Sequence, residues 1–142
     1  MLVSALKSPR GLAWTPDALT LWLAEFGVDG IERLRAVAAT SERPRRVGQR
    51  ASYAIPDRVG LASMAVHSGE GIPRVEGDLL IAAREAGYLL RVRFEQEDRR
   101  RVVTTERLLE NRAGPVHAVT IAADGSIYLA TAHQVWRLAP LQ

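Results

Sequence analysis

The chain repeats one phrase three times, as Ser8-Pro-Arg-Gly-Leu-Ala-Trp14, Arg58-Val-Gly-Leu-Ala-Ser-Met-Ala65 and Val116-His-Ala-Val-Thr-Ile-Ala122. The copies start roughly fifty residues apart, and each is followed by a turn and a second apolar run, at residues 19–26, 77–83 and 126–131. Repetition at this period is typical of β-folds built from blades or stacked units, because one unit cannot bury both of its faces. The number of copies therefore limits what can fold and where a site can form.

Alternating and β-branched runs predict strands in three groups. The first group lies near residues 10–14, 19–25 and 30–37, with a fourth strand expected near 49–54. The second comprises 60–66, 78–83, 87–94 and 101–108, and the third 116–122, 126–131 and 134–138. Residues 2–6 are strand-like and belong to no group. Four-stranded meanders repeated around an axis are the blades of a β-propeller. We therefore predict an all-β fold of about three four-stranded blades, a single partial β-propeller domain over residues 1–142.

Turn residues separate the predicted strands. Asp124-Gly125 lies between two apolar runs and predicts a hairpin turn, since glycine supplies the positive φ that tight turns need. Residues 38–48 are mostly polar, rich in arginine and without period, which predicts an exposed loop. Residues 17–26 and 36–40 also contain helix-favouring alanine and leucine, but the repeat and the turn spacing favour strands.

The composition is ordinary for a globular protein: 142 residues, 47% hydrophobic and 25% charged, with a net charge of +3. Without cysteine the chain has neither disulfides nor cysteine-ligated metals. No apolar run approaches a membrane span, and the N-terminus lacks the pattern of a secretory signal. Arginine clusters at residues 43–46 and 99–101 have acidic neighbours and no interleaved aromatic residues. They favour solvated loops over a nucleic-acid surface.

Five stretches, in this order, carry a family resemblance: Ser8–Trp14, Leu21-Trp-Leu-Ala-Glu-Phe-Gly27, Glu76-Gly-Asp-Leu-Leu-Ile-Ala-Ala83, Glu106-Arg-Leu-Leu109 and Ala122-Ala-Asp-Gly-Ser-Ile-Tyr-Leu-Ala-Thr131. Over nearly the whole chain they resemble the C-terminal half of the soluble glucose/sorbosone dehydrogenases. That family comprises six-bladed propellers that use pyrroloquinoline quinone (PQQ), and its members are often periplasmic or secreted. The resemblance implies half of a six-bladed propeller and an oxidoreductase that acts on a sugar.

The resemblance also implies cofactor-binding positions, several of which are changed here. The family phrase Arg-Asn-Pro-Gln-Gly-Leu-Ala reads Lys7-Ser-Pro-Arg-Gly-Leu-Ala13, so Lys7 and Ser8 replace an arginine and an asparagine that contact the quinone. The phrase Arg-x-Arg-Asp-Val reads Pro115-Val-His-Ala-Val119, which puts His117 at an arginine position. Arg84 lies beside Glu85, which stands where a lysine is expected. Because a quinone with three carboxylates needs several converging cations, we expect a degenerate cofactor site.

The resemblance places a calcium region after the strand that ends at Glu25. Asp29 and Glu32 offer carboxylates there, and a charged turn is the alternative interpretation. The family's general-base histidine would lie in the N-terminal half, which this sequence does not contain.

Of the histidines, His117 is the best site candidate because it begins an inner-strand phrase. His67 is expected in a loop or at a strand end, and His133 on a hairpin tip. The three tryptophans recur at strand positions and predict core packing: Trp14, Trp22 and Trp136.

Two functions stay open. One is a truncated or half-propeller sugar dehydrogenase with a degenerate PQQ site, and the other is a non-catalytic propeller that serves as a scaffold or binding module. Three blades form an arc with two open ends, and the third group lacks an outer strand. We therefore predict either a homodimer, in which residues 2–6 of one copy pair beside 134–138 of another, or a missing N-terminal half-propeller.

Overall fold

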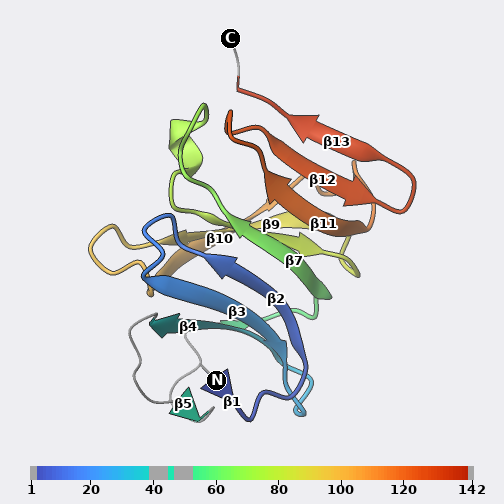
Figure 1. The fold of residues 1–142 in the computed structure, drawn as a ribbon. Coiled ribbons are helices and arrows are strands. Elements are labelled where there is room, and N and C mark those ends of the chain that lie inside the picture. Colours follow the sequence, from blue (N-terminus) through green and yellow to red (C-terminus); the bar gives the residue numbers. More distant parts are fainter. Residues whose placement is uncertain (1–2, 39–44, 47–52, 141–142) are drawn as a thin grey trace.

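The computed structural model describes residues 3–38, 45–46 and 53–140, and its sheets form an arc of three blades (Figure 1). Blade 1 contains β2 (Pro9–Trp14), β3 (Thr20–Phe26), β4 (Glu32–Ala38) and β6 (Tyr53–Ile55). Blade 2 contains β7 (Leu61–Val66), β8 (Leu79–Ala83), β9 (Tyr88–Phe94) and β10 (Val102–Leu108). Blade 3 contains β11 (Val116–Ile121), β12 (Ile127–Thr131) and β13 (Val135–Leu138). Each blade is an antiparallel meander. Its first strand is the innermost one and contains most of one copy of the repeated phrase.

The predicted all-β propeller is confirmed, and so are the strands of the three groups, whose ends lie within two residues of those expected. The fourth strand expected near 49–54 is β6, while residues 49–52 lie outside the described part of the chain. The segments considered as helices at 17–26 and 36–38 are strands or turns. One 3-10 turn, η1 (Pro73–Val75), precedes β8. None of the described residues forms a helix long and apolar enough to cross a membrane.

The N-terminal segment pairs within its own chain. β1 (Val3–Ser4) lies parallel to β5 (Arg45–Arg46), at the blade 1 end of the arc (Figure 1). The predicted loop over residues 38–48 is wrong at two places. Residues 45–46 form strand β5 beside β1, and Ala38 is the last residue of β4. The intervening residues 39–44 and 47–48 lie outside the described residues. The pairing of residues 2–6 with 134–138 of another copy stays a prediction.

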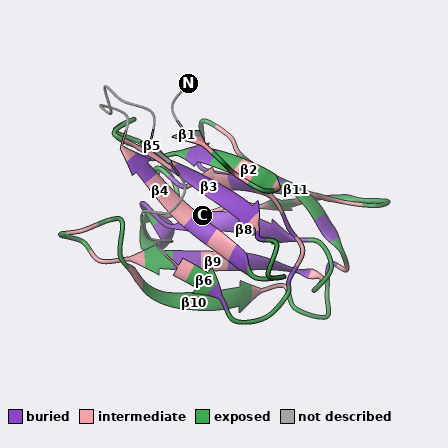
Figure 2. Ribbon diagram, turned by 90° about the horizontal axis from the view of Figure 1, so that it is seen from below, coloured by how far each residue is buried: buried purple, intermediate pink, exposed green. Residues whose placement is uncertain are grey.

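Two apolar clusters hold the blades together, one on each face of blade 2. Strand β8 is buried along its whole length, and its side chains alternate between the two clusters. Trp22 of β3 is fully buried in the first cluster, where its ring stacks on Phe94 at 4.6 Å. Figure 2 shows the result: β3 and β8 are largely buried, and the outer strand β10 is exposed.

Trp14 corrects the prediction of core packing for all three tryptophans. It is 49% exposed, because β2 is the first inner strand of the arc and no earlier blade among the described residues covers it. Trp136 is partly buried against the second cluster.

Each inner strand begins with an irregularity in its pairing. The register shifts between Pro9 and Gly11, between Leu61 and Met64, and between Val116 and Ala118. Such bulges redirect the side chain of the extra residue. In the first and third blades the residues at these bulges are Arg10 and His117, which are both exposed.

Candidate functional site

All the predicted site residues lie at one end of the blades. In an antiparallel meander, the start of the inner strand, the end of the second strand and the start of the third share the same end. The predicted residues occupy these three kinds of position: Lys7, Ser8, Asp29, Glu32, Arg84 and His117. The topology therefore places them on one rim of the arc.

A pocket of about 290 Å³ opens on this rim between blades 1 and 2. Arg10 of β2, Arg58 before β7 and Arg84 after β8 line it. The rest of its lining is Phe26, Glu32, Gly60, Leu61, Ala62 and Glu85. The pocket thus gathers three guanidinium groups from three separate segments.

Glu32 is engaged by the backbone that enters blade 2. Its side chain is buried, and its carboxylate accepts hydrogen bonds from the N–H groups of Val59 (2.6 Å), Gly60 (3.1 Å) and Leu61 (2.8 Å). Three N–H donors to one carboxylate are strong, charge-assisted contacts. Glu32 therefore joins the two blades, and its charge is balanced before any ligand arrives.

The remaining charges of the pocket are positive on balance. Arg58 pairs with Glu85 at 3.0 Å and lies over the ring of Phe26, 5.2 Å from its centre. The side chains of Arg10 and Arg84 are exposed and have no ion-pair partner among the described residues. The pocket can therefore attract an anion.

Asp29 is held in a different contact. Its carboxylate pairs with Arg33 and accepts the N–H of Ile31 at 3.2 Å. The Arg33 side chain, followed by this N–H, holds the pKa of Asp29 well below its ordinary value. Asp29 and Glu32 thus face separate partners. Within the described residues, no three His, Asp or Glu side chains come together as metal ligands.

Three of the four predicted cofactor positions do not line the pocket. The backbone N–H of Lys7 donates to Glu25 at 3.2 Å, and the carbonyl of Ser8 accepts from Phe26 at 3.0 Å. His117 is exposed on blade 3. Only Arg84 lines the pocket.

Sequence reasoning missed Arg10 and Arg58 as site residues. The available signal for Arg10 was its place in the repeated phrase, immediately before Gly11. An added side chain at Gly11 would meet the carbonyl oxygen of Ala62, so β2 and β7 approach closely there. This close approach puts Arg10 beside the start of blade 2.

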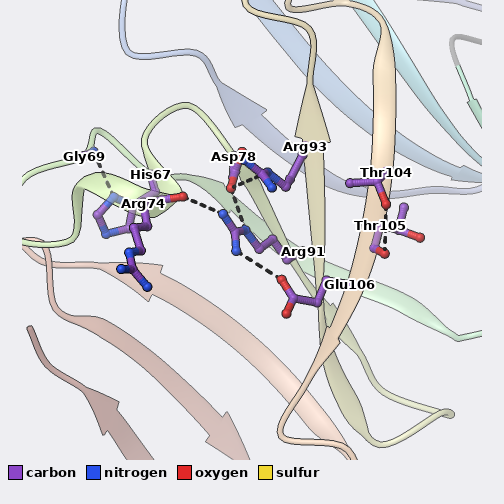
Figure 3. Close-up of polar contacts among 9 residues, drawn as sticks. All are labelled: His67, Gly69, Arg74, Asp78, Arg91, Arg93, Thr104, Thr105 and Glu106. Atoms are coloured by element: carbon purple, nitrogen blue, oxygen red, sulfur yellow. Dashed lines mark hydrogen bonds and ion pairs between the residues drawn. The ribbon is translucent and has the colours of Figure 1, made fainter.

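A second polar cluster lies at the opposite end of blade 2 (Figure 3). Asp78 accepts from Arg91 at 2.6 Å, and Arg91 also pairs with Glu106 at 3.0 Å. His67 is fully buried near it, at the end of β7, which confirms the predicted strand-end position. Its Nδ1 accepts the N–H of Gly69 at 2.9 Å, so Nε2 carries the proton and donates to the carbonyl of Gly125 at 2.8 Å. The three charged side chains pair with one another, and His67 is hydrogen-bonded to two backbone groups, so these are structural contacts.

The repeated antiparallel blades define the chain as a β-propeller. Residues 36–139 match the glucose/sorbosone dehydrogenase family, and the chain belongs to this family. No curated protein matches the sequence.

Solved structures of sugar dehydrogenases are similar to this chain. A glucose dehydrogenase is 26% identical with a TM-score of 0.82, over 100% of this chain and 42% of that chain. The soluble aldose sugar dehydrogenase of Escherichia coli, in its apo-form, is 18% identical with a TM-score of 0.75, over 96% and 45%. The PQQ-bound aldose sugar dehydrogenase of Streptomyces coelicolor is 18% identical with a TM-score of 0.68, over 93% and 39%. The chain thus spans less than half the length of these proteins.

Proposed function

We propose that this chain is a half-propeller of a PQQ-dependent sugar dehydrogenase, in a form whose cofactor site is degenerate. The observation that supports this proposal is the rim pocket between blades 1 and 2. It keeps an anion-attracting character through Arg10 and Arg84, although most positions that the family uses for the quinone are changed. The substrate class would be an aldose sugar, as the names of the similar enzymes indicate.

The residues present do not fit tight binding of PQQ. A carboxylated quinone needs several cations that converge in a desolvated site. Arg10 and Arg84 are exposed, while Lys7, Ser8 and His117 lie outside the pocket that these arginines line. Arg58 is already paired with Glu85. Exposed charge pairs contribute about 1 kcal/mol or less each, so the pairs that Arg10 and Arg84 can form support only a dissociation constant weaker than about 1 mM.

The chain by itself is expected to lack turnover. Glu32 is tied to three backbone N–H groups, and both ring nitrogens of His67 are hydrogen-bonded, so neither is free to act as a general base. The family resemblance assigns the base to the N-terminal half. This engagement of the buried titratable groups also favours the second function, a non-catalytic binding module.

A titration of the purified chain with PQQ tests the proposal. We expect weak binding by the absorbance of the quinone, and further weakening in Arg84→Ala and Arg10→Ala. The matched control is Arg100→Ala, because Arg100 is an exposed arginine paired with Asp98 outside the pocket. Tight, saturable binding by the unchanged chain would contradict the degenerate site.

An activity assay separates the two functions. The chain is supplied with PQQ, calcium, an aldose and an electron-accepting dye. Dye reduction that disappears in Arg84→Ala would establish catalysis by this chain. Binding of PQQ without dye reduction would support a dehydrogenase half that lacks its general base. If the arginine substitutions leave PQQ binding unchanged, the non-catalytic binding module is favoured.

A further inference from the structure

One exposed inner-strand residue of blade 1, Leu12, occupies a position that is buried in the other two blades. Leu12, Met64 and Val119 each lie opposite the central apolar residue of the second strand of their blade. Met64 is 6% exposed and Val119 is 5% exposed, because the preceding blade covers them. Leu12 is 61% exposed. Trp14 lies on the same face and is 49% exposed.

At the other end of the arc, blade 3 exposes a third-strand residue that is buried at the matching position of blades 1 and 2. Leu34, Leu89 and Val135 each pair with an alanine of the second strand, on the side that meets the next blade. Leu34 and Leu89 are fully buried, whereas Val135 is 74% exposed. The two ends of the arc thus each expose a residue that the fold buries wherever a neighbouring blade is present.

The two internal interfaces show how these positions fit together. Leu34 of blade 1 and Met64 of blade 2 belong to one apolar cluster. Leu89 of blade 2 and Val119 of blade 3 belong to the other. By the same rule, Val135 of one blade 3 fits the surface around Leu12 of another blade 1.

We propose that two copies of this chain associate head to tail, with the Val135 face of blade 3 packed on the Leu12 and Trp14 face of blade 1. A second copy is the occupant because one chain carries both complementary faces. Since the chain spans 39–45% of the similar dehydrogenases, two copies approach the length of one such propeller. A head-to-tail contact can therefore close on itself as a two-fold ring.

The contact involves the inner part of blade 1. Leu23 and Val37 lie on the same side of that blade and are already buried, so the surface left open is at β2. Association through this surface leaves β1 paired with β5, and it requires no exchange of residues 2–6. This proposal does not depend on cofactor binding.

Sedimentation equilibrium on the purified chain tests the proposal. We expect a dimer of twice the chain mass of 15.6 kDa. Leu12→Asp and Val135→Asp should each weaken dimerisation at least about a hundredfold, because a charge is then buried at the contact. Val103→Asp is the matched control, since Val103 is 61% exposed on the outer strand β10. Circular dichroism verifies that the variants keep their β-structure.

Mixing the two variants tests the head-to-tail geometry. The Leu12→Asp chain keeps Val135 and the Val135→Asp chain keeps Leu12, so the mixture should form a dimer through one intact contact. A symmetric contact between like faces would give no such recovery. A monomer at all concentrations, a dimer that survives both substitutions, or an unrecovered mixture would overturn the proposal. A monomeric chain would overturn the proposal even if a separate N-terminal half-propeller were found to bind the Leu12 and Trp14 face.

Discussion

The Nε2 of His67 and the carbonyl oxygen of Gly125 lie 2.8 Å apart and join blade 2 to the first turn of blade 3. The ring is fully buried and its other nitrogen accepts the N–H of Gly69. His67→Ala removes both contacts and leaves a cavity, so we expect a loss of about 2–4 kcal/mol in the free energy of unfolding. Urea denaturation measures it. His133→Ala is the control, since His133 is exposed on the β12–β13 turn. Equal stability of the two variants would show that the imidazole contributes nothing to the blade interface.

Glu32→Gln should destabilise the interface between blades 1 and 2. The carboxylate accepts three N–H groups, and an amide would turn its own NH₂ donor toward at least one of them. Because the site is buried, we expect a loss of about 2–3 kcal/mol by urea denaturation. Glu85→Gln, at the exposed partner of Arg58, should change stability by less than about 1 kcal/mol. A Glu32→Gln protein as stable as the Glu85→Gln protein would contradict the joining role of Glu32.

Asp78→Ala should destabilise blade 2. It removes the buried ion-pair partner of Arg91, at a site where the side chains of Asp78 and Arg91 are only 10% and 13% exposed (Figure 3). Breaking such a pair leaves an unbalanced charge and costs about 3 kcal/mol. The change in thermal unfolding checks this, with Asp98→Ala at an exposed pair as the control. Replacing both members, as Asp78→Leu with Arg91→Met, should recover part of the loss, and no recovery would argue against the charge imbalance.

Asp124 should contribute stability that depends on pH. Its carboxylate accepts the N–H of Ser126, then the Ser126 hydroxyl and Arg137, and these contacts lower its pKa from the usual 3.8. A lowered folded-state pKa stabilises the protein above the unfolded pKa, and this contribution is lost as pH falls below about 4. The stability difference between the unchanged protein and Asp124→Asn should therefore shrink between pH 6 and pH 3. A difference that stays constant over this range would refute the assignment.

The strands were predictable because their signals are local. Alternation along β9, the apolar run of β8 and the Asp124-Gly125 turn depend on neighbours in sequence, and the repeat placed each in a blade. Residues 2–6 were strand-like and contain β1, but its partner Arg45–Arg46 lacked such a signal, because a two-residue segment carries no period.

The sequence by itself determined the blades, the family and the rim on which the candidate residues lie, since turn chemistry and antiparallel order decide which end of a blade a residue occupies. Only the tertiary structure decided which of those residues meet. Arg10, Arg58 and Arg84 line one pocket because blades 1 and 2 pack closely at Gly11. The carboxylate of Glu32 is hydrogen-bonded to backbone N–H groups that lie 27–29 positions further along the chain. Leu12, Met64 and Val119 hold the same place in the strand register of their blades, yet only Leu12 is exposed. Whether such a residue is buried depends on the presence of a neighbouring blade, and the sequence pattern within one blade does not predict that.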